Sequence, residues 1–332
     1  MLRWKLSQFP ASRLWQVGYA ILILMAACVL QAEPFNTEGR KVLLPVDTQG
    51  VGHRFWSNGF LAVREIEKAT VHLHNGEGKR LWTVRVTVPE SVQTTLYPVT
   101  VWPDGSAAAA GGAVSADGAR GPFLVLIDPA GKITRMVRTA PFVAQHLTVA
   151  RDGSLWAFGR ILSDWGEKKD KPHMMVRKYS RDGRELAAVL PRDTFPDWPH
   201  PAAAPAVMAA MSSWRDRVGL VTRDGEWVEI STETGEQLAR RKLAIPNPFR
   251  LYGATYGPEG DLYLSGSTRD AAKKEVQVYA RVERASGAWN DVTQKANVTP
   301  YRGLTIVGSD GDSVVLASGA AEVQFVPFAR LR

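Results

Sequence analysis

Hydrophobic residues in this chain occur in short runs that alternate with polar positions, and Asp-Gly or a close variant separates many of the runs. The pattern is clearest in VWPDGSAAAAGG at 101–112, VARDGSLWAFG at 149–159 and YGPEGDLYLSG at 256–266. Runs rich in Val, Leu, Tyr and Trp are typical of strands, and Asp-Gly sets a tight turn because glycine readily adopts a positive φ. Helical apolar spacing over ten or more residues does not occur after residue 35. The pattern predicts an all-β chain built from hairpins.

The hairpins recur within a larger unit of four strands. In the third copy the unit reads AQHLTVA, RDG, SLWAFGR, a loop, MMVRKYS, RDG and RELAAVLP. First strands start near residues 51, 96, 144, 205, 250 and 302, a spacing of 45 to 61 residues. Four strands in about 45 residues are the signature of a propeller blade. The sequence therefore predicts a six-bladed β-propeller with four-stranded antiparallel blades.

The last unit contains only three strands before the chain stops at Arg332. A fourth strand is available from RKVLLPV at 40–46, which precedes the first unit and has no other partner. Closing the ring with this N-terminal strand would remove exposed sheet edges, which are templates for aggregation. We expect a signal peptide or membrane anchor at 1–32, a linker at 33–39 and the propeller at 40–332. A seventh blade would require splitting the third unit, which contains no additional turn phrase.

The units resemble those of the NHL-repeat and TolB-like six-bladed propellers over about residues 40–332. The resemblance is carried by DGS at 104–106, DGSLW at 152–156, EGDLY at 259–263, DPAGK at 128–132 and RDGR at 181–184. It departs from NHL units at Gly111, Gly159 and Gly266, near the point where a second strand usually ends in Asp. The resemblance implies a ligand at the channel mouth, on the face of the second-to-third and blade-to-blade loops. It leaves the chemistry open, because this fold carries many functions.

The N-terminus has the features of an export signal. Three basic residues precede an apolar run at 17–30, which at 14 residues is shorter than the roughly 20 expected for a membrane span. Cleavage after Ala32, an uncleaved anchor and lipidation at Cys28 all remain open. Each would place the propeller in the periplasm, outside the cell, or anchored outside the cytoplasm. Cys28 is the only cysteine, so the exported part has no disulfide to stabilise it.

Charge and motifs exclude several classes of function. The net charge is +8, or +5 without residues 1–32, and the longest purely basic run is only RRK at 240–242, so we predict no nucleic-acid partner. The sequence has no P-loop, dinucleotide glycine fingerprint or GxSxG elbow, and we predict no cofactor. His72 and His74 alternate on one strand but lack the further ligands that zinc needs, so we predict no metal and place them on a polar, solvent-facing surface.

The candidate site lies in the third unit, whose two ligand-side connections are the longest. Each has an Asp-Trp pair and a histidine beside a proline: Asp164, Trp165 and His173 in 160–173, and Asp197, Trp198 and His200 in 191–205. Tryptophan in an exposed loop indicates a contact surface. The alternative is that both tryptophans pack their loops onto the blade and the histidines are solvated. His146, within an inner strand, is a further candidate to line the channel.

The predicted inner strands carry no Asp or Glu. Resemblance to the lactonase-type members implies channel carboxylates around a divalent cation, so this absence argues against that chemistry. We therefore expect an exported, non-enzymatic propeller that binds a protein, peptide or glycan through the loop face at the channel mouth. The alternative is an enzyme of the lactonase or sugar-dehydrogenase propeller type, acting on a small molecule in the channel with His146 nearby.

Overall fold

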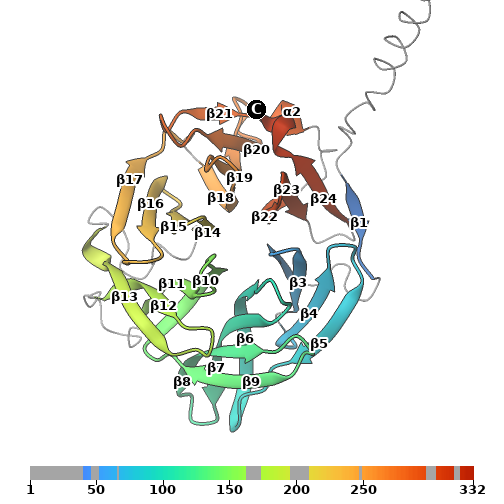
Figure 1. Ribbon diagram of the computed structural model, residues 1–332, viewed down its shortest axis with the longest axis vertical. Helices are drawn as coiled ribbons and strands as arrows, with labels where there is room; N and C mark the ends of the chain where they lie inside the picture. Colours follow the sequence, from blue (N-terminus) through green and yellow to red (C-terminus); the bar gives the residue numbers. More distant parts are fainter. Residues whose placement is uncertain are drawn as a thin grey trace, which may run out of the picture. The chain divides into compact units, whose positions relative to one another are not determined.

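The computed structural model describes residues 40–45, 52–65, 67–161, 173–194, 209–246, 249–296, 304–317 and 322–332. Arg40–Arg332 form one compact unit. Its described residues contain six four-stranded antiparallel sheets, and Figure 1 shows them arranged as blades around a central axis. The predicted fold is confirmed: this part of the chain is a six-bladed β-propeller.

Each of the first five sheets uses four consecutive strands, with the first strand innermost (Figure 1). The first sheet contains β2 (His53–Ser57), β3 (Phe60–Glu65), β4 (Thr70–Asn75) and β5 (Arg80–Arg85), and the second contains β6 (Ser91–Val101), β7 (Ala107–Ser115), β8 (Arg120–Ile127) and β9 (Ile133–Arg138). The third contains β10 (Phe142–Val149), β11 (Leu155–Ile161), β12 (Met174–Tyr179) and β13 (Glu185–Pro191). The fourth contains β14 (Ala210–Trp214), β15 (Arg217–Val221), β16 (Glu226–Ser231) and β17 (Gln237–Lys242), and the fifth contains β18 (Phe249–Tyr256), β19 (Leu262–Arg269), β20 (Glu275–Val282) and β21 (Trp289–Asp291).

The sixth sheet has a different connectivity. It contains β22 (Thr305–Asp310), β23 (Ser313–Ala317), β24 (Glu322–Pro327) and β1 (Lys41–Leu43). Strand β1 pairs antiparallel with β24, with Lys41 opposite Gln324 and Leu43 opposite Glu322. The outer strand of the last sheet therefore comes from the start of the described chain. The only described helices are the short α2 (Thr293–Ala296), η2 (Arg192–Thr194) and η4 (Phe328–Leu331).

The Asp-Gly phrases form the turns between strands, as their sequence indicates. Between β10 and β11 the amide of Gly153 donates to the Ala150 carbonyl at 2.9 Å, and Gly153 has a φ of 80°. The Asp152 carboxylate accepts from the Ser154 amide at 2.9 Å. Burial would raise the pKa of Asp152, but hydrogen bonds from Ser154 and Lys178 outweigh burial and hold that pKa below its usual value. Asp152 therefore stabilises a turn.

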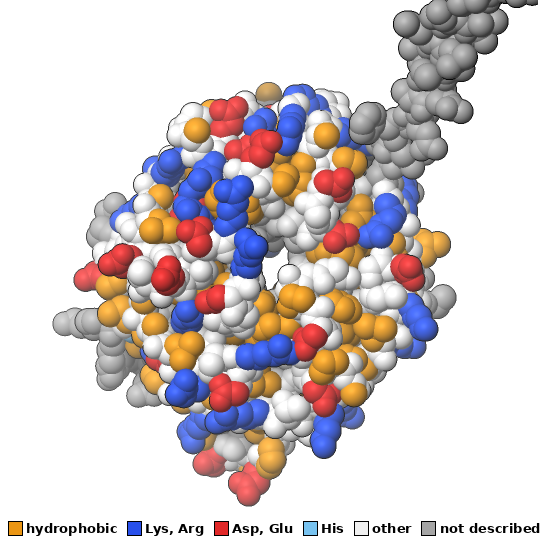
Figure 2. Space-filling view, in the orientation of Figure 1, with side chains coloured by type: hydrophobic (Ala, Val, Ile, Leu, Met, Phe, Trp, Pro, Cys, Tyr) orange, Lys and Arg blue, Asp and Glu red, His pale blue; other side chains and the backbone are white. Residues whose placement is uncertain are grey.

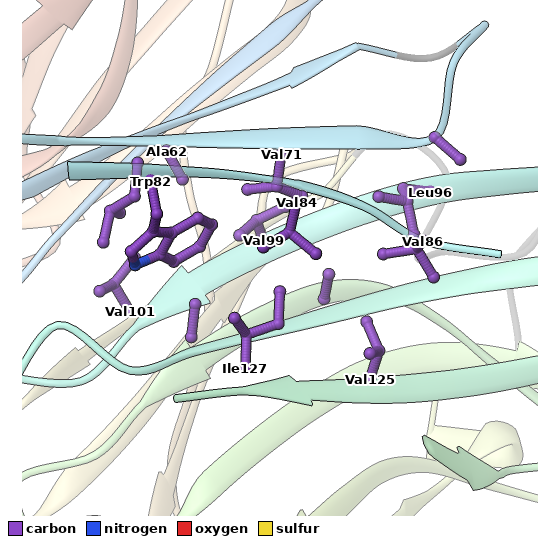
Figure 3. Packing of buried hydrophobic residues seen from close by; sticks show 14 of the residues in the cluster. Ala62, Val71, Trp82, Val84, Val86, Leu96, Val99, Val101, Val125 and Ile127 are labelled. Atoms are coloured by element: carbon purple, nitrogen blue, oxygen red, sulfur yellow. The ribbon is translucent and has the colours of Figure 1, made fainter. Parts of the chain in front are cut away.

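Neighbouring sheets share buried hydrophobic clusters, and these clusters hold the ring together. Figure 3 shows the cluster between the first two sheets, where Trp82 and Val84 lie close to Val99. Trp156, on β11, is fully buried in the cluster between the third and fourth sheets. Trp56 of β2 packs edge-on against Phe325 of β24, with ring centroids 5.0 Å apart, so the first and last sheets also share a core. Burying each such side chain contributes roughly 1.5–3 kcal/mol.

The prediction that His72 and His74 face solvent is wrong. They lie opposite Val63 and Leu61 in the β3–β4 register, on the sheet face that packs against the sixth sheet. Both are buried, with 6% and 0% of their surface exposed. The His72 Nε2 lies 2.7 Å from a Glu65 carboxylate oxygen.

Candidate functional site

A cavity of about 640 Å³ lies along the axis of the ring. Residues of the inner strands of all six sheets line it, so it is the central channel of the propeller. In Figure 2 the channel opens at the centre of the face shown, and basic and acidic side chains are interspersed around it. Because every blade repeats the same strand order, the six inner strands begin at one end of the channel and finish at the other.

Hydroxyl groups line the end where the inner strands finish, next to the Asp-Gly turns. They form three pairs between neighbouring blades, each a threonine facing a serine. The oxygen–oxygen distances are 3.3 Å for Ser57–Thr100, 3.5 Å for Thr148–Ser213 and 3.0 Å for Thr255–Ser309. These pairs satisfy one another and join adjacent blades, which makes this end of the channel polar and uncharged among the described lining residues.

Four of the inner strands contain a bulge, and each bulge turns a side chain into the cavity. The register shifts lie at Leu96/Val99 in β6, Ala144/His146 in β10, Leu251/Gly253 in β18 and Ile306/Gly308 in β22. The residues within these shifts include Tyr97, Gln145, Tyr252 and Val307, and all four line the cavity. A bulge places two residues opposite one and thereby re-aims a side chain. The irregular register therefore supplies much of the lining.

Glycine in the second strand makes room for the inner strand next to the bulge. A Cβ on Gly159 of β11 would lie 2.1 Å from the Val143 carbonyl oxygen and 2.8 Å from the Phe142 ring. Gly111 and Gly266 occupy the same place in the second and fifth sheets and have equally close neighbours. These are the three positions where the chain departs from the NHL pattern. A second-strand side chain there would collide with the inner strand.

The end where the inner strands begin carries three basic side chains, which we call the cationic end: His53, Arg54 and Arg64. His53 and Arg64 are register partners of β2 and β3, and all three residues line the cavity. The backbone approach is close, because a Cβ on Gly52 would lie 1.5 Å from the Arg64 carbonyl oxygen. Gly52 also has a φ of 65°, so no other residue fits there without strain.

Burial perturbs all three groups of the cationic end, and nearby positive charge also perturbs His53. Burial, followed by the positive charges of Arg64 and Arg54, lowers the pKa of His53. Burial lowers the pKa of Arg54, and it lowers the pKa of Arg64 to about 10. Each shift disfavours the charged form, as expected for basic groups that are partly removed from water, and in His53 the neighbouring positive charges add to this effect.

The lining contains no Asp or Glu among the described residues. Strand β22 does end in an acid, which corrects the expectation for the inner strands, but Asp310 is not part of the lining and its carboxylate pairs with Arg40 at 3.2 Å. Near the cavity, the Tyr252 hydroxyl donates to the Glu275 carboxylate at 2.8 Å. Glu275 is on β20 and is not a lining residue. In the part of the chain that the structure describes, no cluster of three metal-binding side chains occurs.

The sequence-predicted site residues are only partly covered by the structure. His146 lines the cavity, and its ring stacks on Phe158 with centroids 6.1 Å apart. His173 is half-buried just before β12 and is not among the cavity-lining residues; its carbonyl accepts from the Arg192 amide at 2.9 Å. The other candidates, Asp164, Trp165, Asp197, Trp198 and His200, lie outside the described residues.

The strand ends nevertheless define where the two long connections leave the blade. Ile161, the last residue of β11, is paired with Phe142, the first residue of β10. Met174, which begins β12, is paired with Pro191 at the end of β13. These ends lie at the edge of the sheet where the inner strand begins. This is also the edge that carries the cationic end in the first sheet.

Sequence reasoning missed the cationic end and the bulged side chains. GHRFW at 52–56 was an available signal, because it places a histidine and an arginine in an otherwise apolar inner strand. Arg64 belongs to the next strand, and only the β2–β3 register brings it beside His53.

Within the described residues, no helix is long and apolar enough to cross a membrane.

Comparisons with known proteins give no family for this chain. No protein-family model and no curated protein matches it. Among solved structures, Sqt1 of Saccharomyces cerevisiae is 10% identical over 81% of this chain and 81% of its own, with a TM-score of 0.43. The β-propeller domain of Cps50 (Swd1) from Myceliophteria thermophila is 10% identical over 86% of this chain and 99% of its own, with a TM-score of 0.48. The fold assignment rests on the six sheets themselves.

Proposed function

We propose that this chain is an exported β-propeller that binds a protein, peptide or glycan through the face where the inner strands begin. The observation that carries the proposal is the lining of the channel. The described lining residues are hydroxyl-bearing, amide-bearing, aromatic, apolar and basic, and none is a carboxylate. Such a lining suits recognition of a ligand better than carboxylate-assisted hydrolysis.

The same face supports the proposal through its loops. The connections at 162–172 and 195–208 lie outside the described residues, but the strands that flank them end at the edge where the inner strands begin. Trp165 and Trp198 belong to these connections. The kinship we propose, to NHL-repeat and TolB-like propellers, is supported by the Asp-Gly turns and by the six blades. Export is supported by the N-terminal apolar run at 17–30.

Capture of a partner tests the proposal. The purified full chain is immobilised and incubated with an extract of the exported fraction of its source cells. Replacing Trp165 and Trp198 with Ala should abolish capture without changing thermal stability. Arg151→Ala is the matched control, because Arg151 is exposed in the turn at the opposite end of the third blade and should capture normally. Capture that survives both tryptophan substitutions would reject the proposal.

One observation favours the enzymatic alternative enough to test it. His146 lines the same cavity as Arg54 and Arg64, an arrangement in which an imidazole and two guanidinium groups face one small space. A sugar- or lactone-converting propeller would use such a histidine as a general base. Turnover of a small panel of lactones and sugars, lost in His146→Gln, would support this alternative, and the absence of turnover would count against it.

A further inference from the structure

We infer that the cationic end of the channel, formed by His53, Arg54 and Arg64, binds an acidic group of the ligand, a carboxylate or a phosphate. The inference rests on the proposed function, because it assigns a chemistry to the same face. It narrows the ligand from any protein, peptide or glycan to one that presents an oxyanion small enough to enter the channel.

Arg64 is the central residue of this site. Only 7% of its surface is exposed, and a buried arginine is ordinarily paired with a carboxylate. Among the described residues no carboxylate lies within ion-pair distance of Arg64. Its Nη1 instead donates to two backbone carbonyls, those of Leu96 at 2.9 Å and of Tyr97. Its buried Nε has no hydrogen-bond partner in the described structure. The guanidinium therefore retains both charge and donor capacity at the cavity wall.

The neighbours of Arg64 reinforce its preference for an anion. His53 is its register partner, and Arg54 follows His53 directly in β2. The positive charges of Arg64 and Arg54, after burial, lower the pKa of His53, which shows that His53 lies within the field of both guanidinium groups. The planar guanidinium fork of arginine matches the paired oxygens of a carboxylate or phosphate. A cationic ligand would be repelled, and a neutral ligand would leave the charge of Arg64 without an anion.

The cavity is large enough and open enough to admit such a group. Its volume of about 640 Å³ lies within the range of roughly 300–1,000 Å³ that small-molecule sites occupy. His53 is exposed, so the cationic end is reached from solvent. The bulged residues Gln145 and Tyr252 line the same cavity, where Gln145 offers a polar amide and Tyr252 an aromatic ring to the uncharged remainder of a ligand.

Binding of simple oxyanions tests the inference on the full chain. Thermal shift and calorimetry are recorded with sodium phosphate and with sodium succinate, against sodium chloride at equal ionic strength and against glucose. We expect saturable binding of at least one oxyanion and none of glucose. Arg64→Gln should weaken binding at least tenfold, and Arg64→Lys should restore part of it, since lysine keeps the charge but not the fork. Arg135→Gln is the control, because Arg135 is half-exposed on the outer strand β9 and pairs with Asp182.

The outcomes separate this inference from the proposed function. Phosphate binding alone or succinate binding alone identifies which oxyanion the site prefers, and both support the inference.

Should Arg64→Gln fail to fold, His53→Gln replaces it, since His53 is exposed and its loss should still weaken binding severalfold. Equal binding in wild type and variants, or no binding at constant ionic strength, overturns the inference. If partner capture then still depends on Trp165 and Trp198, the proposed function stands without it. If oxyanions bind but capture does not depend on Trp165 and Trp198, the cationic end is an oxyanion site and the proposed function is rejected.

Discussion

Replacing Gly159 with alanine should destabilise the propeller, because this glycine leaves the space that Phe142 and Val143 of β10 occupy just before the bulge. The new Cβ would lie 2.1 Å from the Val143 carbonyl oxygen and 2.8 Å from the Phe142 ring. The first contact is with backbone, which cannot rotate away, so the inner strand must move. Phe142 is 1% exposed and sits in the cluster between the second and third sheets, so it also has little room to yield.

The magnitude follows from two opposing effects. Overpacking a tight site costs about 1–3 kcal/mol, and the backbone contact places this case at the upper end. Replacing glycine in the unfolded chain recovers about 0.5–1 kcal/mol of conformational entropy. The net loss should be about 2 kcal/mol, or about 3 °C in melting temperature for a unit that spans residues 40–332.

The assay is thermal and urea unfolding of wild type, Gly159→Ala and a matched control. Gly121→Ala is that control, because Gly121 lies in β8, has no positive φ, and has no atom within 4 Å of the place that a Cβ would take. It should remain within about 0.5 kcal/mol of wild type. If Gly159→Ala is as stable as Gly121→Ala, the bulge does not need the glycine and this account of the channel lining is incorrect.

Three further predictions concern the charges and the ring. Glu229→Ala should cost about 3–5 kcal/mol in urea unfolding, because Glu229 is 4% exposed and its removal takes away the buried carboxylate that Arg217 and Arg284 share. Trp56→Ala should cost about 3–5 kcal/mol, since Trp56 fills the cluster between the first and last sheets. His53 has a folded pKa below its unfolded value near 6.5, so the unfolded chain binds more protons and stability should fall as pH drops below about 6.5. Arg64→Gln should raise the pKa of His53, measured by NMR, and flatten that fall.

Glu236→Ala, an exposed carboxylate in the same blade, should change stability by less than about 0.5 kcal/mol. An equal loss of stability in Glu236→Ala and Glu229→Ala would show that burial of the Glu229 carboxylate does not cause the destabilisation. A neutral Trp56→Ala would contradict a shared core between the first and last sheets. A His53 pKa at or above 6.5 in the wild type would remove the evidence for repulsion at the cationic end.

The sequence was sufficient to predict the blades because each turn is encoded locally. Asp-Gly at 104–105 and 152–153 sets the hairpin by its own backbone preference, and the repeat of this phrase sets the number of blades. The same phrase first suggests a site, since Asp152 and Trp156 lie close together. Their copies and their contacts assign the Asp to a turn and the Trp to the core.

The channel lining could be predicted only in part, because it depends on register. His146 was identified from its inner strand, but Gln145 and Tyr252 face the cavity through bulges that no pattern of alternation predicts. The cationic end needs His53 and Arg64 to be register partners, which depends on the length of one hairpin. The burial of His72 depends on the packing of the first sheet against the sixth, which is a property of the closed ring.

Displacement of a captured partner by a simple oxyanion tests the central claim most directly. The immobilised full chain, with its partner bound, is washed with phosphate or succinate against chloride at equal ionic strength. The account predicts that an oxyanion releases the partner from the wild type, and that Arg64→Gln captures at least tenfold less partner while Arg135→Gln captures normally. Capture that resists both oxyanions and is unchanged in Arg64→Gln would contradict it.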